Sequence, residues 1–203
     1  MNGWPIVGWA TLVVAAIVAV ILGTVGAAEA GIRMVLRATA RTSAVFFTLA
    51  FAASALRRRW PNAATGWLLR NRRQLGVSFA VSHFVHLLAI FALVGWTWAG
   101  FRAAVPAGTL AVGGLAYTFL VLMTLTSFDA PAARLGPRAW RRLHTTGAYY
   151  LWFVFAQNYF VAATFSAFYW PYAALVAGAM ALRWLPAPRA ARAPVDLAPR
   201  RLA

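Results

Sequence analysis

Residues 70–98 read RNRRQLGVSFAVSHFVHLLAIFALVGWTW. The stretch opens with arginines and then stays apolar for roughly 20 residues, the length that a helix needs to cross a bilayer. His83 and His86 lie inside this apolar run. An ionisable side chain within a membrane span is unfavourable and marks a functional site by default. Because neutral imidazole is a good ligand for iron, the stretch predicts both a membrane span and a metal site.

The composition indicates an integral membrane protein. Of the 203 residues, 63% are hydrophobic and only 11% are charged, whereas about a quarter of the residues of a soluble domain are charged. The absence of cysteine excludes disulfides, iron–sulfur clusters and thiolate-ligated haem. The net charge of +16 comes from arginines at the ends of apolar runs. Arginines in this position are typical of residues that set membrane topology and contact lipid headgroups, rather than of a nucleic-acid-binding surface. We therefore expect the lipid bilayer as the partner.

The apolar runs predict an all-α fold, a polytopic bundle of six transmembrane helices. The runs fall at 5–27, 39–56, 75–98, 108–128, 146–165 and 167–185. The run 39–56 is short, and we expect it to extend upstream through GIRMVLRATA. The first run lacks the charged n-region of a signal peptide and exceeds the length of its apolar region, so we expect it to be retained. One membrane domain would then cover 1–186, followed by a basic, disordered tail at 187–203.

The arginines alternate between the connections of this bundle. Fifteen of them fall in the second and fourth connections and in the C-terminal segment, and only four fall in the others. Cytoplasmic loops carry the excess of arginine and lysine, so the larger set belongs on the cytoplasmic side. With six spans, both termini would be cytoplasmic. We therefore expect a multi-pass protein of a bacterial-type inner membrane.

The histidines form the candidate cofactor site. His83 and His86 are spaced i, i+3 and so share one helix face, and His144 lies at the start of the run 146–165. Imidazoles from neighbouring helices can hold a b-type haem in a bundle. The alternative is structural: a membrane histidine can bond a neighbouring helix for about 0.6–2 kcal/mol. His144 alone also suits a headgroup or haem-propionate contact. The three together favour haem ligation.

Depth along the helices limits which side chains can pair. At 1.5 Å per residue, His83 lies ~15 Å and His86 ~20 Å beyond Arg73. His144 lies only ~3 Å beyond Arg142, so it matches either histidine poorly. The residue of its own helix at the level of His86 is Gln157, ~22 Å beyond Arg142. A buried amide needs a partner, so Gln157 is a further candidate for the site.

Two longer segments carry a resemblance to a known family. The segments are RNRRQLGVSFAVSHFVHLL and LTSFDAPAARLGPRAWRRLHTTGAYYLWF. The matching features are RR-x-LG with His86 downstream, the LTS that ends the fourth run, and W-x-x-LH before the fifth. Over about 38–165 the chain resembles the ferric reductase-like transmembrane domain family. Its members include the membrane haem subunit of the bacterial periplasmic methionine-sulfoxide reductase system and, more distantly, NADPH oxidases.

The resemblance implies one or two b haems held by histidines of the third and fifth helices. His86 and His144 are the ligands it would assign here, His83 is a further candidate ligand, and Arg73 and Arg142 suit the propionates. The chain departs from the family at Gln157, where members carry a second histidine. An outer haem would then be five-coordinate on His86, or bound with weak help from Gln157. Alternatively, His83 compensates by pairing with His144.

The resemblance implies an electron relay, and it is compatible with a subunit of a ferric reductase-like oxidoreductase. The chain has neither a nucleotide-binding motif nor an acidic pair placed for acid–base catalysis. Electrons would therefore come from a quinone or a cytoplasmic flavin reductase and leave to an outer-face protein acceptor. The alternative is a haemless membrane partner or scaffold that keeps the fold without redox activity. A transporter is a weaker third interpretation, because no pair of broken helices is evident.

Overall fold

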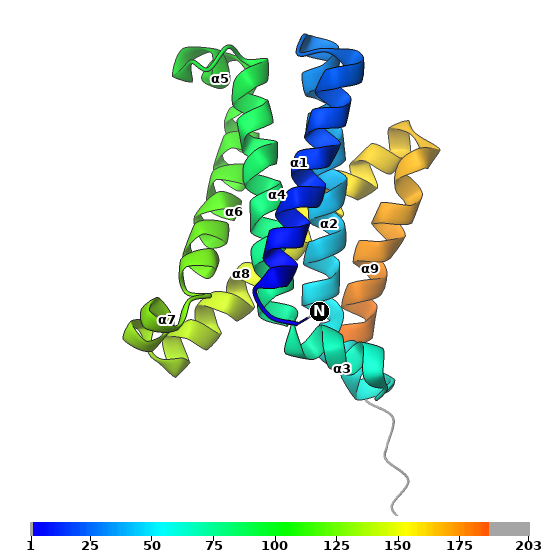
Figure 1. Cartoon of the computed structure of the whole chain (residues 1–203), viewed down its shortest axis with the longest axis vertical. Helices are drawn as coiled ribbons and strands as arrows, with labels where there is room; N and C mark the ends of the chain where they lie inside the picture. Colours follow the sequence, from blue (N-terminus) through cyan, green and yellow to red (C-terminus); the bar gives the residue numbers. More distant parts are fainter. Residues whose placement is uncertain (1, 187–203) are drawn as a thin grey trace, which may run out of the picture.

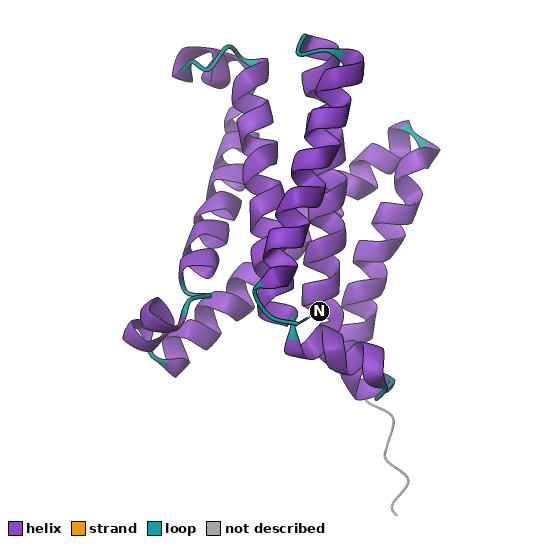
Figure 2. Ribbon diagram, viewed as in Figure 1, coloured by secondary structure: helices purple, strands orange, loops and turns teal. Residues whose placement is uncertain are grey.

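The computed structural model describes residues 2–186, which contain helices and no strand (Figures 1 and 2). The all-helical fold expected from the apolar runs is confirmed, and the predicted tail at 187–203 lies outside the described residues. The elements are α1 Pro5–Val25, α2 Glu29–Arg59, α3 Ala63–Arg70, α4 Arg72–Leu93, α5 Trp98–Ala104, α6 Ala107–Leu125, α7 Asp129–Leu135, α8 Pro137–Phe165, η1 Ala167–Tyr169 and α9 Trp170–Trp184.

Four of the described helices are long and apolar enough to cross a membrane. These are α1, α2, α4 and α6, with mean hydropathies of 2.6, 1.3, 1.9 and 1.7. α8 has 29 residues but opens with PRAWRRLHTT. α9 has 15 residues, fewer than the roughly 20 of a full span. Each of the six predicted runs corresponds to one of these six helices, but membrane crossing by all six stays a prediction.

The boundaries of α2 and α4 can be compared with the expected runs. α2 begins at Glu29, so the expected upstream extension of 39–56 is found as one continuous helix of 31 residues. The run 75–98 instead breaks after Leu93, where Gly95 and Trp96 both take positive φ. Thr97 then caps α5, accepting a hydrogen bond from a backbone N–H of that short helix. Because the segment is rich in apolar aromatic residues, its composition did not indicate this turn.

α3 and α7 lie at the same end of the bundle, on opposite sides of it, and α5 lies at the other end (Figure 1). The start of the chain is fixed at the α3 and α7 end. The backbone N–H of Gly3 donates to Oδ1 of Asn71 at 2.8 Å, and Trp4 stacks on Phe128 with 5.1 Å between ring centroids. Most of the described arginines belong to this end. We call it the arginine-rich end.

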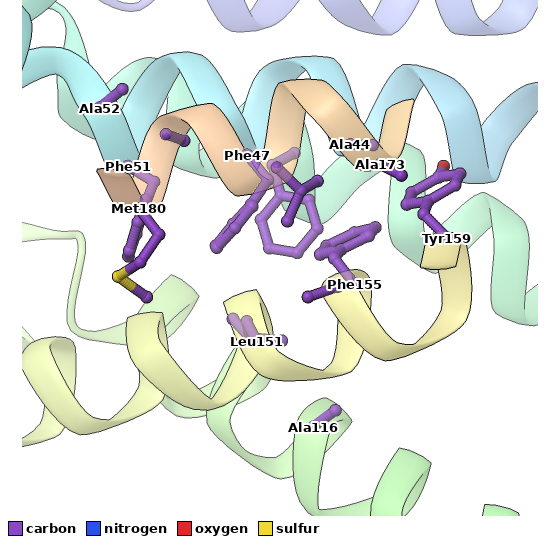
Figure 3. Packing of buried hydrophobic residues seen from close by; sticks show 14 of the residues in the cluster. Ala44, Phe47, Phe51, Ala52, Ala116, Leu151, Phe155, Tyr159, Ala173 and Met180 are labelled. Carbon is purple, nitrogen blue, oxygen red and sulfur yellow. The ribbon is translucent and has the colours of Figure 1, made fainter. Parts of the chain in front are cut away.

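The core is formed mainly by α2, α8 and α9, with smaller contributions from α4 and α6 (Figure 3). Phe47 of α2 stacks on Phe155 of α8 with 5.2 Å between centroids. α2 and α4 make the most extensive contact, and fully buried Ser43 and Ser82 lie on these helices. Small residues let helix backbones approach closely in a membrane. The hydroxyl of Ser82 uses this proximity to donate to the carbonyl of Thr39 at 3.0 Å.

Candidate functional site

His83 and His86 lie side by side on α4. Their rings stack with 5.1 Å between centroids and 8° between planes, in agreement with the shared face that the i, i+3 spacing predicts. His83 also stacks on Tyr117 of α6 at 5.1 Å and lies 5.6 Å from the Phe155 ring of α8. His83 therefore faces α6 and α8 from its place on α4.

His86 has a defined hydrogen-bond partner on the neighbouring helix. Its Nδ1 lies 3.0 Å from the carbonyl oxygen of Leu36 and 3.5 Å from Oγ1 of Thr39. A carbonyl only accepts, so Nδ1 carries the proton and donates. Nε2 of the neutral ring then keeps its lone pair. Histidines that ligate metals are typically oriented by such a hydrogen bond from the other ring nitrogen.

His83 differs from His86 in that its Nδ1 is the nitrogen without a partner. Its buried Nδ1 has no hydrogen-bond partner within residues 2–186. Its backbone carbonyl accepts a hydrogen bond from the hydroxyl of Tyr117 at 3.0 Å, which fixes α6 against α4. A buried polar atom without a partner is unfavourable. His83 is therefore a second candidate ligand at this level of the bundle.

His144 lies apart from that pair, two turns into α8 rather than at a helix mouth, because α8 begins at Pro137. Its ring stacks on Trp140 with 4.1 Å between centroids, and its Nε2 lies 2.9 Å from Oγ1 of Thr126. The indole of Trp140 donates to the carbonyl of Thr126 at 2.9 Å. Trp140 and Thr126 thus orient the imidazole from two sides. A metal bound at Nε2 would replace the Thr126 hydroxyl as its partner.

A cavity of about 670 Å³ opens beside His144 at the arginine-rich end. We call this cavity the inner pocket. α2, α4, α6, α8 and α9 all contribute to its walls. Its apolar wall includes Phe47, Phe51, Phe79, Leu120 and Met123. Its polar wall includes Arg70, Arg72, Arg73, Arg141, Arg183 and His144. This volume and mixture are typical of a small-molecule or cofactor site.

The other residues expected at the site separate into two groups. Arg73 lines the inner pocket, and its Nη1 lies 2.8 Å from Oδ1 of Asp129. Arg142 and Gln157 are exposed and do not line the inner pocket. No contact within residues 2–186 joins His144 to His83 or His86. The structure therefore brings His83 to His86, and His144 to Arg73, as two separate sets.

Sequence reasoning missed Arg183 as a site residue. Its place near the end of the last apolar run suggests only a topology signal, yet it lines the inner pocket from α9. Its Nη1 donates to the carbonyl of Phe51 at 2.9 Å, and its guanidinium lies 4.4 Å from the centroid of the Phe51 ring. The signal that could have found it is its position inside the run 167–185, where an arginine needs a partner.

No protein-family model, curated protein or solved structure matches the chain. Within residues 2–186 there is also no group of three or more His, Cys, Asp or Glu side chains that could hold a metal ion. A haem iron needs only one or two axial side chains, because the porphyrin supplies the other ligands. The histidines of this chain therefore fit the ligation of a haem better than the binding of a bare metal ion.

Proposed function

We propose that this chain is a b-type cytochrome of the ferric reductase-like kind, with six membrane spans and both termini in the cytoplasm. It relays electrons from a quinone or a cytoplasmic flavin donor to an acceptor on the outer face of a bacterial-type inner membrane. The observation that carries the proposal is the inner pocket, whose lining combines one imidazole, several aromatic side chains and a group of arginines.

The residues of the inner pocket fit a haem. A haem has a flat apolar body, an iron that takes axial imidazole, and two carboxylates on one edge. The Phe47 and Phe79 side chains supply an apolar wall, His144 supplies the imidazole, and the arginines supply partners for carboxylates. When bound, haem supplies one-electron redox chemistry, tuned by its axial ligand and its burial. His144 would hold the iron in this proposal, and Trp140 holds its ring in place.

His86 is the proposed ligand of a second haem, deeper in the bundle. Its Nδ1–H donates to the carbonyl of Leu36 and leaves Nε2 free to ligate. Gln157 is exposed, so this position has no ligand from α8 on the opposite side. His86 alone would then hold the second haem, unless His83 takes part. Electrons could then pass between two levels of the bundle.

The substitution His86→Asn separates ligation from hydrogen bonding. The Asn amide places a donor near the position of Nδ1, so the bond to Leu36 is kept, while the Nε2 lone pair is lost. We expect His86→Asn to lower the haem content of the purified protein and to leave its melting temperature within a few degrees of wild type. Haem content equal to wild type would show that His86 only bonds α2.

The alternative function is a haemless scaffold that keeps the fold. The exposure of Gln157, at the position of the family's second histidine, favours this alternative over a complete relay. The two functions differ in the visible spectrum of the purified protein. A Soret band with an α band on reduction supports the cytochrome, and their absence after expression with added haem supports the scaffold.

The proposed topology predicts the location of each connection. Alkaline phosphatase, which is active only outside the cytoplasm, should be active when fused near residue 27, 105 or 166. It should be inactive when fused near residue 61 or 136, because the arginine excess holds those connections inside. A reporter protein that fluoresces only in the cytoplasm should give the reciprocal pattern. Activity at residue 136 would contradict six spans.

A further inference from the structure

The inner pocket carries more positive charge than its own side chains neutralise. Five arginines line it, whereas Asp129 is the carboxylate among its lining residues. The Asp129 side chain is 95% exposed and is already paired with Arg73, so it contributes little to the interior. Positive charge in a partly desolvated cleft attracts anions strongly, because the low-dielectric walls focus the field.

Two of these arginines, Arg72 and Arg183, come from different helices and face the same pocket. Arg72 begins α4 and Arg183 lies in the last turn of α9. Both side chains line this pocket, the Arg72 side chain exposed and the Arg183 side chain half-buried. Neither forms an ion pair within residues 2–186, and Arg72 forms no hydrogen bond there. Two positive charges that line one cavity without an ion pair favour a bound anion, because the anion offsets their mutual repulsion.

Arg183 is held in position rather than free to swing into solvent. Besides its bond to the carbonyl of Phe51, its Nε lies 3.4 Å from the hydroxyl of Tyr149. Its guanidinium also lies 5.1 Å from the centroid of the Tyr149 ring. These contacts use Nε and one terminal nitrogen. Nη2 has no protein partner within residues 2–186 and is left for a ligand.

We propose that Arg72 and Arg183 clamp the acidic group of an amphiphilic ligand whose apolar body lies against Phe47, Phe79 and Leu120. Guanidinium binds carboxylate and phosphate oxygens through paired hydrogen bonds. Two sources share this chemistry: the propionate of a haem, or the phosphate of an anionic phospholipid. The haem source rests on the proposed function, whereas the phospholipid source does not.

The experiment compares ligands that differ only in their acidic group. Purified protein in neutral detergent is titrated with haemin and with haemin dimethyl ester, which lacks the free carboxylates. In a parallel arm it is titrated with short-chain phosphatidylglycerol and phosphatidylcholine. The variants are Arg183→Gln, Arg72→Gln and Arg183→Lys. Arg138→Gln is the matched control, because Arg138 is exposed on α8 and does not line the inner pocket.

Wild type and Arg138→Gln should bind the acidic member of one ligand pair more tightly than the other member. That member is haemin in the first pair and phosphatidylglycerol in the second. Arg183→Gln and Arg72→Gln should reduce that preference by roughly tenfold to a hundredfold, the range for a charged hydrogen bond. Arg183→Lys should keep part of the preference for the acidic ligand, because lysine keeps the positive charge but lacks the paired N–H donors of guanidinium. Measuring the preference within each variant removes the effect of a general loss of folding, and the Arg72 variant leaves the Phe51 bond intact.

The arms separate the two sources. Preference for haemin over its ester assigns the clamp to a propionate and supports the cytochrome. Preference for phosphatidylglycerol without haemin binding keeps the clamp and rejects the cytochrome. If haemin and its dimethyl ester bind equally well, the cytochrome proposal stands, but the proposal that Arg72 and Arg183 bind a haem propionate is rejected. Equal preferences in wild type, Arg183→Gln and Arg72→Gln overturn the clamp for both sources.

Discussion

His144→Ala should abolish haem binding in the inner pocket. Of the described histidines, His144 is the one that lines this pocket. Its ring stacks on Trp140 with 4.1 Å between ring centroids. Alanine leaves the apolar wall and the arginines in place but removes the ligand to iron. The expected result is loss of the haem that this pocket holds, seen as a lower Soret absorbance per protein.

Thr126→Val is the matched control for that substitution. Its hydroxyl lies 2.9 Å from Nε2 of His144, so valine removes the hydrogen bond and keeps the shape and the imidazole. We expect Thr126→Val to retain haem, because iron would replace this hydroxyl at Nε2. Equal haem content in wild type and His144→Ala would show that His144 is a structural residue. Equal loss in both variants would assign the effect to packing.

Gly147→Leu should destabilise the contact between α6 and α8. Gly147 is buried on α8, and a Cβ at this position would meet the side chains of Met123 and Phe119 on α6. Overpacking of this kind typically costs about 1–3 kcal/mol. Gly147 lies one turn from His144, so moving α8 away from α6 should also disturb the inner pocket. Thermal unfolding in detergent measures the first effect, and haem content measures the second.

Gly178→Leu is the control for the glycine substitution. Gly178 lies inside α9 and is exposed, and the place that a Cβ would take there has no other atom within 4 Å. Both substitutions add the same side chain to a helix interior, so helix propensity cancels in the comparison. We expect Gly178→Leu to unfold near the wild-type temperature. Equal melting temperatures for the two variants would mean that α6 and α8 do not pack closely at Gly147.

The helices could be predicted from the sequence because their signals are local. Apolar runs of membrane-spanning length and arginine clusters at their ends identify helical segments without knowledge of packing. The boundaries were less predictable. The turn at Gly95 and Trp96 lies within an apolar run, and the first turns of α8 lie within an arginine cluster. Apolar composition identifies segments that can lie in lipid, but it does not locate the residue at which a helix begins or ends.

The candidate site was only partly predictable, because rotation about a helix axis leaves no clear signal in a strongly apolar sequence. The i, i+3 spacing was enough to place His83 beside His86. The depth estimate, which separated His144 from them, agrees with their lying in separate sets. The position of Arg183 within an apolar run indicated that it needs a partner, but not that it would reach the same pocket as His144. That convergence depends on how the last helix packs against α2 and α8.

The haem content of the purified wild-type chain tests the cytochrome proposal most directly. The chain should be expressed with added haem, and its absolute spectra should be recorded oxidised and reduced. Haem per protein should then be measured by extraction. We predict a b-type spectrum with a histidine-ligated iron and at least one haem per chain. Protein that is folded and monodisperse but carries no haem would contradict the proposal.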